Sequence, residues 1–159
     1  MAKTSESLAE RLEREGKKNL LFFEKLSPED WEKQVYSDGA AWTVRDMFTH
    51  VVETEQTLPR LFQGIISGGG GVGDEFDLDY YNESKVVKAG ETSPQVLLNT
   101  FAERRKETVK FVTDLAEEDL LKIGSHPFLG NAEIAEMVKL MYIHVQLHIR
   151  DVRNVIKGD

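Results

Sequence analysis

The residues best suited to chemistry are two histidines four positions apart, His144 and His148. They lie between Glu133 and Lys157, where apolar residues recur at the three- and four-residue spacing of one buried helical face. Because side chains four apart on a helix stack one above the other, these two imidazoles can converge on one point. Two interpretations are open at this stage. Either each ring is a core histidine satisfied by a hydrogen bond, or the pair helps to bind a metal ion.

A third histidine favours the metal-binding interpretation. His50 lies on the inward or border face of a second amphipathic segment, which opens with Thr43 as the expected N-cap and Asp46 in the first turn. If the two segments are neighbours in the fold, His50, His144 and His148 can reach one divalent ion. Neutral imidazoles suit zinc, with nickel or iron as alternatives. Three protein ligands leave one position open, as in a catalytic zinc site, for water, a thiolate or a carbonyl.

Two carboxylates are candidates for orienting these imidazoles. Glu53 lies one turn after His50, and Asp151 lies three residues after His148. Each could accept the second ring N–H of a ligand histidine, or each could be an ordinary surface charge. The fourth histidine, His126, falls in an expected loop from Lys122 to Asn131, and we expect its side chain to face solvent.

Four long amphipathic segments predict an all-α four-helix bundle, with residues 1–159 forming a single domain. The first runs from about Ser5 to Lys25, and Ser7 with Glu10 fits a capping box near its start. The second contains Pro59, which is expected to bend or interrupt it. The third begins at Ser93-Pro94, with Ser93 as the expected cap, and the fourth is expected to be capped by Asn131. No convincing alternation typical of β-strands is present.

A long, glycine-rich connection separates the second and third segments. Five of the six residues from Gly68 to Gly73 are glycine, which is incompatible with regular structure and favours a mobile connection. A phosphate-binding loop is rejected because no Gly-Lys-Ser/Thr follows. The acidic run Asp77–Tyr81 lacks the third oxygen ligand and the central glycine of an EF-hand calcium loop. Its tyrosines and the valines 86 and 87 suggest that the connection packs back onto the body.

The composition narrows the class of protein further. The net charge of −8 argues against a nucleic-acid surface, and no stretch approaches the ~20 apolar residues of a membrane span. The charged N-terminus lacks a signal-peptide core, so a cytoplasmic location is expected. With no cysteine, the chain has neither a thiolate metal site nor a cysteine nucleophile.

Three motifs in order along the chain carry a family resemblance. They are Trp42-Thr43-Val44-Arg45-Asp46-Met47-Phe48-Thr49-His50, Asp79-Tyr80-Tyr81-Asn82-Glu83 and His144-Val145-Gln146-Leu147-His148-Ile149-Arg150-Asp151. Each is short, but together they span most of the chain. They resemble the DinB/YfiT-like superfamily of metal-binding four-helix bundles. The tryptophan-containing opening and the middle motif are most similar to the N-terminal domain of mycothiol-dependent maleylpyruvate isomerases.

The resemblance implies a divalent metal at His50, His144 and His148, and a homodimer. It also implies small-molecule chemistry with a low-molecular-weight thiol, as an S-transferase or isomerase, although the separate C-terminal domain of the isomerases is missing. A metal-dependent hydrolase and a non-catalytic metal or ligand-binding module remain as alternatives. Asn82 is a candidate for orienting the substrate and Arg150 for binding a substrate carboxylate; alternatively, Asn82 caps a turn and Arg150 pairs with a surface acid.

Overall fold

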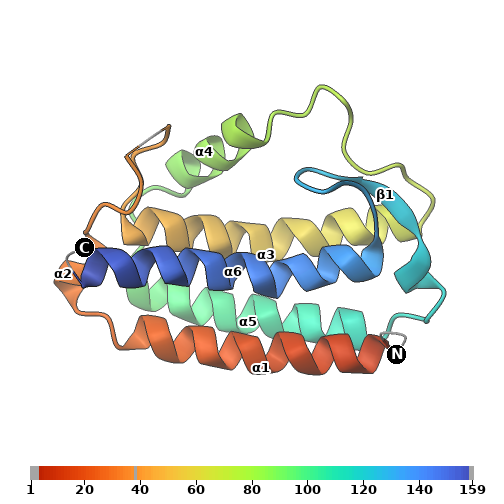
Figure 1. Ribbon diagram of the computed structural model, residues 1–159, viewed down its shortest axis with the longest axis horizontal. Coiled ribbons are helices and arrows are strands. Elements are labelled where there is room, and N and C mark those ends of the chain that lie inside the picture. Colours follow the sequence, from red (N-terminus) through yellow and green to blue (C-terminus); the bar gives the residue numbers. More distant parts are fainter. Residues whose placement is uncertain (1–3, 38, 158–159) are drawn as a thin grey trace.

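The computed structural model describes residues 4–37 and 39–157, and within them the chain is mostly helical. Four long helices lie side by side (Figure 1). They are α1 (Ser5–Glu24), α3 (Val44–Ile66), α5 (Pro94–Thr113) and α6 (Ile134–Ile156). The shorter helices are α2 (Pro28–Trp31), α4 (Leu78–Ala89) and a 3-10 turn, η1 (Asp119–Leu121). The predicted helical bundle is therefore present, together with elements that were not predicted.

The helix starts test the capping predictions. Thr43 and Ser93 cap α3 and α5 as predicted, with their side chains accepting from the amides of Asp46 and Val96. At α1 the prediction was wrong, because the capping box pairs Thr4 with Ser7 and lies one turn earlier than expected. At α6 the N-cap is Glu133 rather than Asn131, since β2 continues the extended chain up to that residue.

Pro59 does not interrupt its helix. Helix α3 continues from Val44 to Ile66 with Pro59 inside it, although a proline there removes the backbone donor to the carbonyl of Glu55. Phe62 and Ile65, beyond the proline, are buried in the core, so their packing stabilises the helical turns that follow the proline. Of the bend or interruption expected at this position, the interruption does not occur, and the bend stays a prediction.

The core is tied across the long helices by aromatic packing and a buried ion pair. The rings of Phe23, Phe48 and Phe101 pack in sequence, with centroids 4.4 and 5.7 Å apart. Arg105 on α5 binds Glu55 on α3 through two hydrogen bonds of 2.7 and 3.0 Å, and both side chains are almost fully buried. A third bond of 3.0 Å joins Arg105 to the Leu12 carbonyl of α1. These contacts fix α3, which carries His50, against the rest of the bundle.

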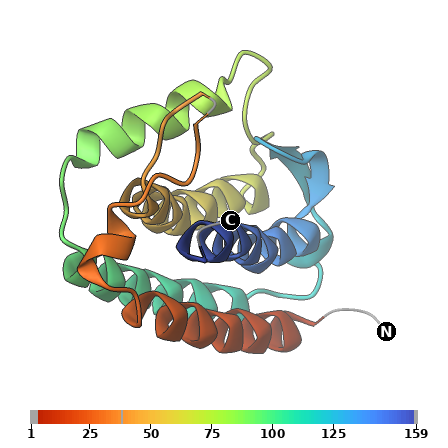
Figure 2. The same cartoon turned by 60° about the vertical axis from the view of Figure 1, so that its left-hand side comes forward.

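An unpredicted β-hairpin precedes α6. Strand β1 (Ile123–His126) pairs antiparallel with β2 (Gly130–Glu133). Gly130 has a φ of +71°, which suits the end of a three-residue turn. Figures 1 and 2 show that the hairpin and α4 lie on the same side of the molecule, where they flank the face formed by α3 and α6.

The glycine-rich segment packs along this hairpin. The Val72 amide donates to the Ser125 carbonyl over 2.9 Å, and the Ser125 amide donates to the Gly70 carbonyl over 2.8 Å. Gly71 has a φ of +91°, and a Cβ there would meet the Ser125 backbone, so glycine is required at this position. The chain then forms α4, where Val86 is buried, but Tyr80 and Val87 are 72% and 79% exposed. The connection thus packs back onto the body as expected, with α4 against α3 and Val86 buried, although the side chains of Tyr80 and Val87 are not part of that contact.

None of the helices within the described ranges is both long and apolar enough to cross a membrane.

Candidate functional site

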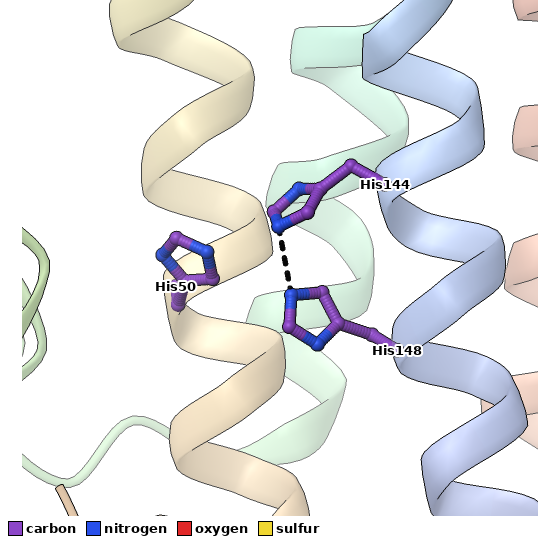
Figure 3. A group of neighbouring side chains, drawn as sticks. All are labelled: His50, His144 and His148. Atoms are coloured by element: carbon purple, nitrogen blue, oxygen red, sulfur yellow. Dashed lines mark hydrogen bonds between the residues drawn. The ribbon is translucent and has the colours of Figure 1, made fainter. Parts of the chain in front are cut away.

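Three histidines meet between α3 and α6 (Figure 3). His50 comes from α3, and His144 and His148 come from consecutive turns of α6. The potential ligand atoms of these three residues, the triad, all lie within 4.8 Å of one another. The Nε2 atoms of His144 and His148 are 2.8 Å apart, and the His50 ring centroid lies 5.3 and 5.5 Å from theirs. The triad predicted from sequence is thus assembled by the fold.

Local packing explains why these rings point inward. Met47 and Val51 bury the turns around His50, and Val145 and Ile149 do the same for the pair on α6. Trp42, just before α3, lies with its ring centroid 5.2 Å from that of His50. His50 is itself only 7% exposed, so its imidazole is held in a largely dry environment.

A hydrogen-bond chain fixes the tautomer of His148. The Tyr36 hydroxyl donates to Asp151 Oδ2 over 2.8 Å and lies 2.7 Å from His148 Nδ1. Because the hydroxyl has one proton, already given to the carboxylate, His148 Nδ1 must donate to the Tyr36 oxygen. His148 Nε2 therefore carries the lone pair of the ring, which faces His144 Nε2 at 2.8 Å. This is the tautomer that a metal ligand requires.

Burial keeps the triad neutral. It lowers the pKa of His50 to about 3, and the neighbouring rings of His144 and His148 add to the effect. Burial, and secondarily His144, lowers the pKa of His148 to about 3, while Asp151 opposes the shift. Burial also lowers the pKa of His144. Neutral imidazoles near pH 7 are competent metal ligands, because no proton has to be removed from a cation.

The two carboxylates expected near the triad have different surroundings. Asp151 reaches His148 through Tyr36 rather than directly. Glu53 lies 3.8 Å from the Arg104 guanidinium of α5, whereas the hydroxyl of Thr54 is the group beside His50, 3.5 Å from Nδ1. Sequence reasoning missed Tyr36, because it lies in the segment between α2 and α3, more than a hundred positions before its partners, where no spacing rule applies.

His126 does not face solvent, and that expectation was wrong. Its side chain is 5% exposed, and its Nδ1 accepts hydrogen bonds from the amides of Phe128 and Leu129 over 3.0 and 3.2 Å. Its Nε2 is buried without a hydrogen-bond partner, which costs about 1–3 kcal/mol. Burial, and secondarily His144, lowers the pKa of His126 to about 4. The signal for this placement was the later Gly130, which marks a hairpin turn.

Two cavities share His50 and His144 as part of their walls, and His148 lines only one of them. The first, the polar cavity, has a volume of about 340 Å³, and its other lining residues include Tyr36, Trp42, Asp79 and Glu83. The second, the apolar cavity, has about 180 Å³ and lies toward the hairpin, where its lining includes Leu58, Phe76, Tyr81, Phe128 and Leu147. His50, His144 and Asn82 border both cavities, and His126 borders only the apolar one.

The two residues predicted to contact substrate differ in position. Asn82, on α4, lines both cavities and so lies where a ligand near the triad would pass. Arg150 is exposed, with its guanidinium 3.4 Å from Asp151 Oδ1, and it lines neither cavity. A substrate-binding role for either residue stays a prediction.

The donor set fits a divalent metal. Three neutral imidazoles converge, and the proton of His148 is held on the nitrogen away from the cluster, which leaves its lone pair available. Three nitrogen ligands suit zinc, nickel or iron(II), and they leave room for an exogenous ligand from either cavity. The chain is thus a helical bundle with a histidine cluster between two facing helices, which is where bundle proteins that bind metals or cofactors place their sites.

Comparison with known proteins specifies the family. The chain belongs to the DinB superfamily, whose family model matches residues 11–152. No curated protein matches it in sequence. The chain is similar in fold to the crystal structure of a mycothiol-dependent maleylpyruvate isomerase, with a TM-score of 0.75 and 12% identity over 94% of this chain. It spans 61% of the length of that isomerase chain, so the likeness establishes a shared fold and no more.

Proposed function

We propose that this protein is a metal-dependent enzyme that uses a low-molecular-weight thiol, as an S-transferase or an isomerase. The triad would bind one divalent ion, with zinc favoured and nickel or iron as alternatives. The observation that carries the proposal is that the triad lies between two cavities of different character. Such an arrangement suits a reaction in which two small molecules approach one centre from different sides.

Different residues of the chain would orient the metal ligands and bind the two small molecules. Tyr36 and Asp151 would hold His148 in its ligand tautomer, and the Trp42 ring would help to hold the His50 ring that it packs against. A bound divalent metal would keep a thiol deprotonated near neutral pH, which supplies the nucleophile that a cysteine-free chain lacks. Asp79 and Glu83 would favour a polar thiol with hydroxyl or amino groups in the polar cavity. Asn82 is placed to orient whichever molecule enters.

The test is calorimetry of the zinc-loaded protein with cysteamine, N-acetylcysteine and glutathione as probes. The titrations are repeated near pH 7 in buffers of different ionisation enthalpy. Because a free thiol has a pKa of ~8.5, coordination as thiolate should release a proton into the buffer. We expect binding that depends on zinc and is accompanied by proton release. Absence of thiol binding while zinc remains bound would contradict the thiol proposal. It would favour the alternative functions, a metal-dependent hydrolase or a non-catalytic binding module.

We also propose that residues 1–159 form one domain, located in the cytoplasm, that assembles as a homodimer. Leu21 on α1 and Val96 on α5 are 56% and 51% exposed, and a dimer would remove such apolar side chains from water. Sedimentation at micromolar concentration should show a species of twice the chain mass. A monomer alone would contradict the dimer without affecting the proposed metal site.

A further inference from the structure

The polar cavity is lined by two carboxylates and by no lysine or arginine of the described chain. Asp79 and Glu83 lie four residues apart on α4, so they share one face of that helix. Both residues are exposed, and neither side chain forms a hydrogen bond or an ion pair with another described residue. The same cavity is bordered by all three histidines of the triad. Two carboxylates that pair with no described cation therefore lie beside any molecule bound at the triad.

A nitrogen of the triad is open to such a molecule. His50 is only 7% exposed, and its Nε2 has no hydrogen-bond partner among the described residues. Fully enclosed polar side-chain atoms without a partner occur elsewhere in the described chain, but His50 Nε2 is not one of them. Because His50 lines the polar cavity, a small molecule can reach this buried side chain, or a metal ion that it binds, between the same walls that carry the two carboxylates.

Two aromatic rings extend the wall of the polar cavity. Tyr36 and Trp42 both line it and are half-buried, and Trp42 is held by its contact with the His50 ring. Aromatic faces attract ammonium groups, and tryptophan does so most strongly. Arg150, the residue predicted to bind a substrate carboxylate, lines neither cavity. The walls of the polar cavity thus match a positively charged group and offer no partner to a carboxylate.

The formal charges around the triad lead to the same conclusion. A divalent ion on three neutral imidazoles brings two positive charges, and a bound thiolate offsets one of them. Asp79 and Glu83 add two negative charges, so one negative charge stays unbalanced. An ammonium group on the thiol would balance it, whereas a carboxylate would double it. Since like charges held close together disfavour binding, a thiol with an amino group is the better occupant.

We propose that the polar cavity selects small molecules that carry an ammonium group beside the atom that binds the metal, and that Asp79 and Glu83 make this selection. The inference rests on the proposed function where it identifies the thiol substrate as an amino thiol. Thiols that carry a carboxylate are disfavoured by the same two residues. The apolar cavity has no charged residue in its lining, so this selection belongs to the polar side alone.

The experiment compares two thiols that differ in the sign of their charge. Cysteamine and 3-mercaptopropionate each carry a charged group two carbons from the sulfur. Calorimetry at low ionic strength, where salt screens charges least, measures their dissociation constants with the zinc-loaded protein. The test variant is Asp79→Asn/Glu83→Gln. The matched control is Asp74→Asn/Glu75→Gln, which removes the same charge from two exposed residues that line neither cavity.

We expect the preference for cysteamine over 3-mercaptopropionate to fall roughly 5- to 50-fold in the test variant relative to wild type. Four charge interactions are removed, two attractive and two repulsive, and an exposed charge pair typically contributes a factor of about 1.5 to 5. Comparison with wild type cancels the intrinsic difference between the two thiols. The control should change the preference less than about 2-fold. An unchanged preference in the test variant, or an equal change in both variants, would overturn the proposal.

A second pair of ligands separates this result from the proposed function. β-Alanine hydroxamate and succinic acid monohydroxamate both bind zinc through a hydroxamate, and they carry an ammonium and a carboxylate at the same distance from it. If no thiol binds but the hydroxamates show a preference for the ammonium that depends on Asp79 and Glu83, the thiol proposal fails and the charge selection stands. If thiols bind without regard to charge, the charge selection fails and the thiol proposal stands.

A third measurement needs neither metal nor a variant. In NMR spectra of the metal-free wild type, millimolar propylammonium should shift the Trp42 indole N–H resonance and the backbone amide resonances of α4, because both border the polar cavity. Propionate at the same concentration should leave these resonances unchanged. Equal shifts with the two ions, or no shift with propylammonium, would overturn the proposal.

Discussion

Buried imidazoles on the two sides of the triad differ in how many of their ring nitrogens have a hydrogen-bond partner. On the polar side, His148 has a partner at both ring nitrogens, Tyr36 at one and His144 at the other. On the apolar side, His126 is satisfied at Nδ1 alone, and its Nε2 has no partner. Burial lowers the pKa of both residues, so pKa alone does not separate them. The hydrogen-bond partners instead assign the tautomers. His148 carries its proton on Nδ1, so its Nε2 can bind a metal, whereas His126 carries its proton on Nε2, which can only donate.

The largest effect should come from removing a ligand imidazole. His148→Ala, His144→Ala or His50→Ala should each weaken zinc binding by more than about 100-fold, beyond the 10–100-fold typical of residues that only orient a ligand. Helix content should be retained, because the hydrophobic faces of the bundle do not depend on the site. Competition with a chromophoric chelator measures the affinity. His126→Ala is the control, and a comparable loss in that variant would contradict the distinction between the two sides.

A smaller effect is expected at Tyr36. Tyr36→Phe removes the oxygen that accepts from His148 Nδ1 and ends the connection to Asp151, so zinc affinity should fall roughly 10–100-fold. Far-ultraviolet circular dichroism checks that the helices remain. Since Arg150 contacts Asp151 at the surface, Arg150→Ala serves as a control that should leave affinity within about 3-fold. Unchanged zinc affinity in Tyr36→Phe would contradict a role for the Tyr36–Asp151 hydrogen-bond chain in orienting His148.

The third prediction concerns how the free energy of unfolding depends on pH. The histidines stay neutral in the folded protein but have a pKa near 6.5 when unfolded. As pH falls below about 6.5 the unfolded chain binds protons that the folded chain does not, so the free energy of unfolding decreases. With a folded pKa of about 4, His126 alone accounts for roughly 2 kcal/mol of this loss between pH 7 and 5.

Urea denaturation of the metal-free protein at several pH values measures this dependence. His126→Asn should show a shallower loss of stability between pH 7 and 5 than wild type, because it removes one of the titrating groups. Thr57→Val should follow the wild-type dependence. If His126→Asn and wild type lose stability in parallel over this range, His126 is not held neutral by the fold.

Local chemistry predicted the parts of the fold that depend on neighbouring residues. Thr43 and Ser93 cap their helices through contacts three residues away, and the spacing of the triad on α3 and α6 follows from helical periodicity. At α1, Thr4 and Ser7 are equally suitable caps by type. Two long-range hydrogen bonds accompany the earlier start: the Ser5 hydroxyl donates to the Leu115 carbonyl, and the Ser5 amide donates to the Glu117 carboxylate.

The parts that sequence reasoning missed depend on contacts between distant segments. Strand β1 is short, and part of its support comes from the glycine-rich segment around Gly71, more than fifty residues earlier. Because strand β1 was not predicted, the sequence did not indicate that the His126 side chain is buried. Tyr36 likewise reaches His148 and Asp151 only after α3 and α6 have packed. The histidine triad could be predicted from spacing, but the groups that assign each imidazole its tautomer could not.

The central claim is that His50, His144 and His148 form a site for one divalent metal. The most direct test is the metal content of wild-type protein that has been loaded with zinc and dialysed in a buffer without chelator. The account predicts one zinc ion per chain, retained through dialysis at pH 7. Less than stoichiometric zinc, with nickel and iron(II) also failing to reach one ion per chain, would contradict the claim.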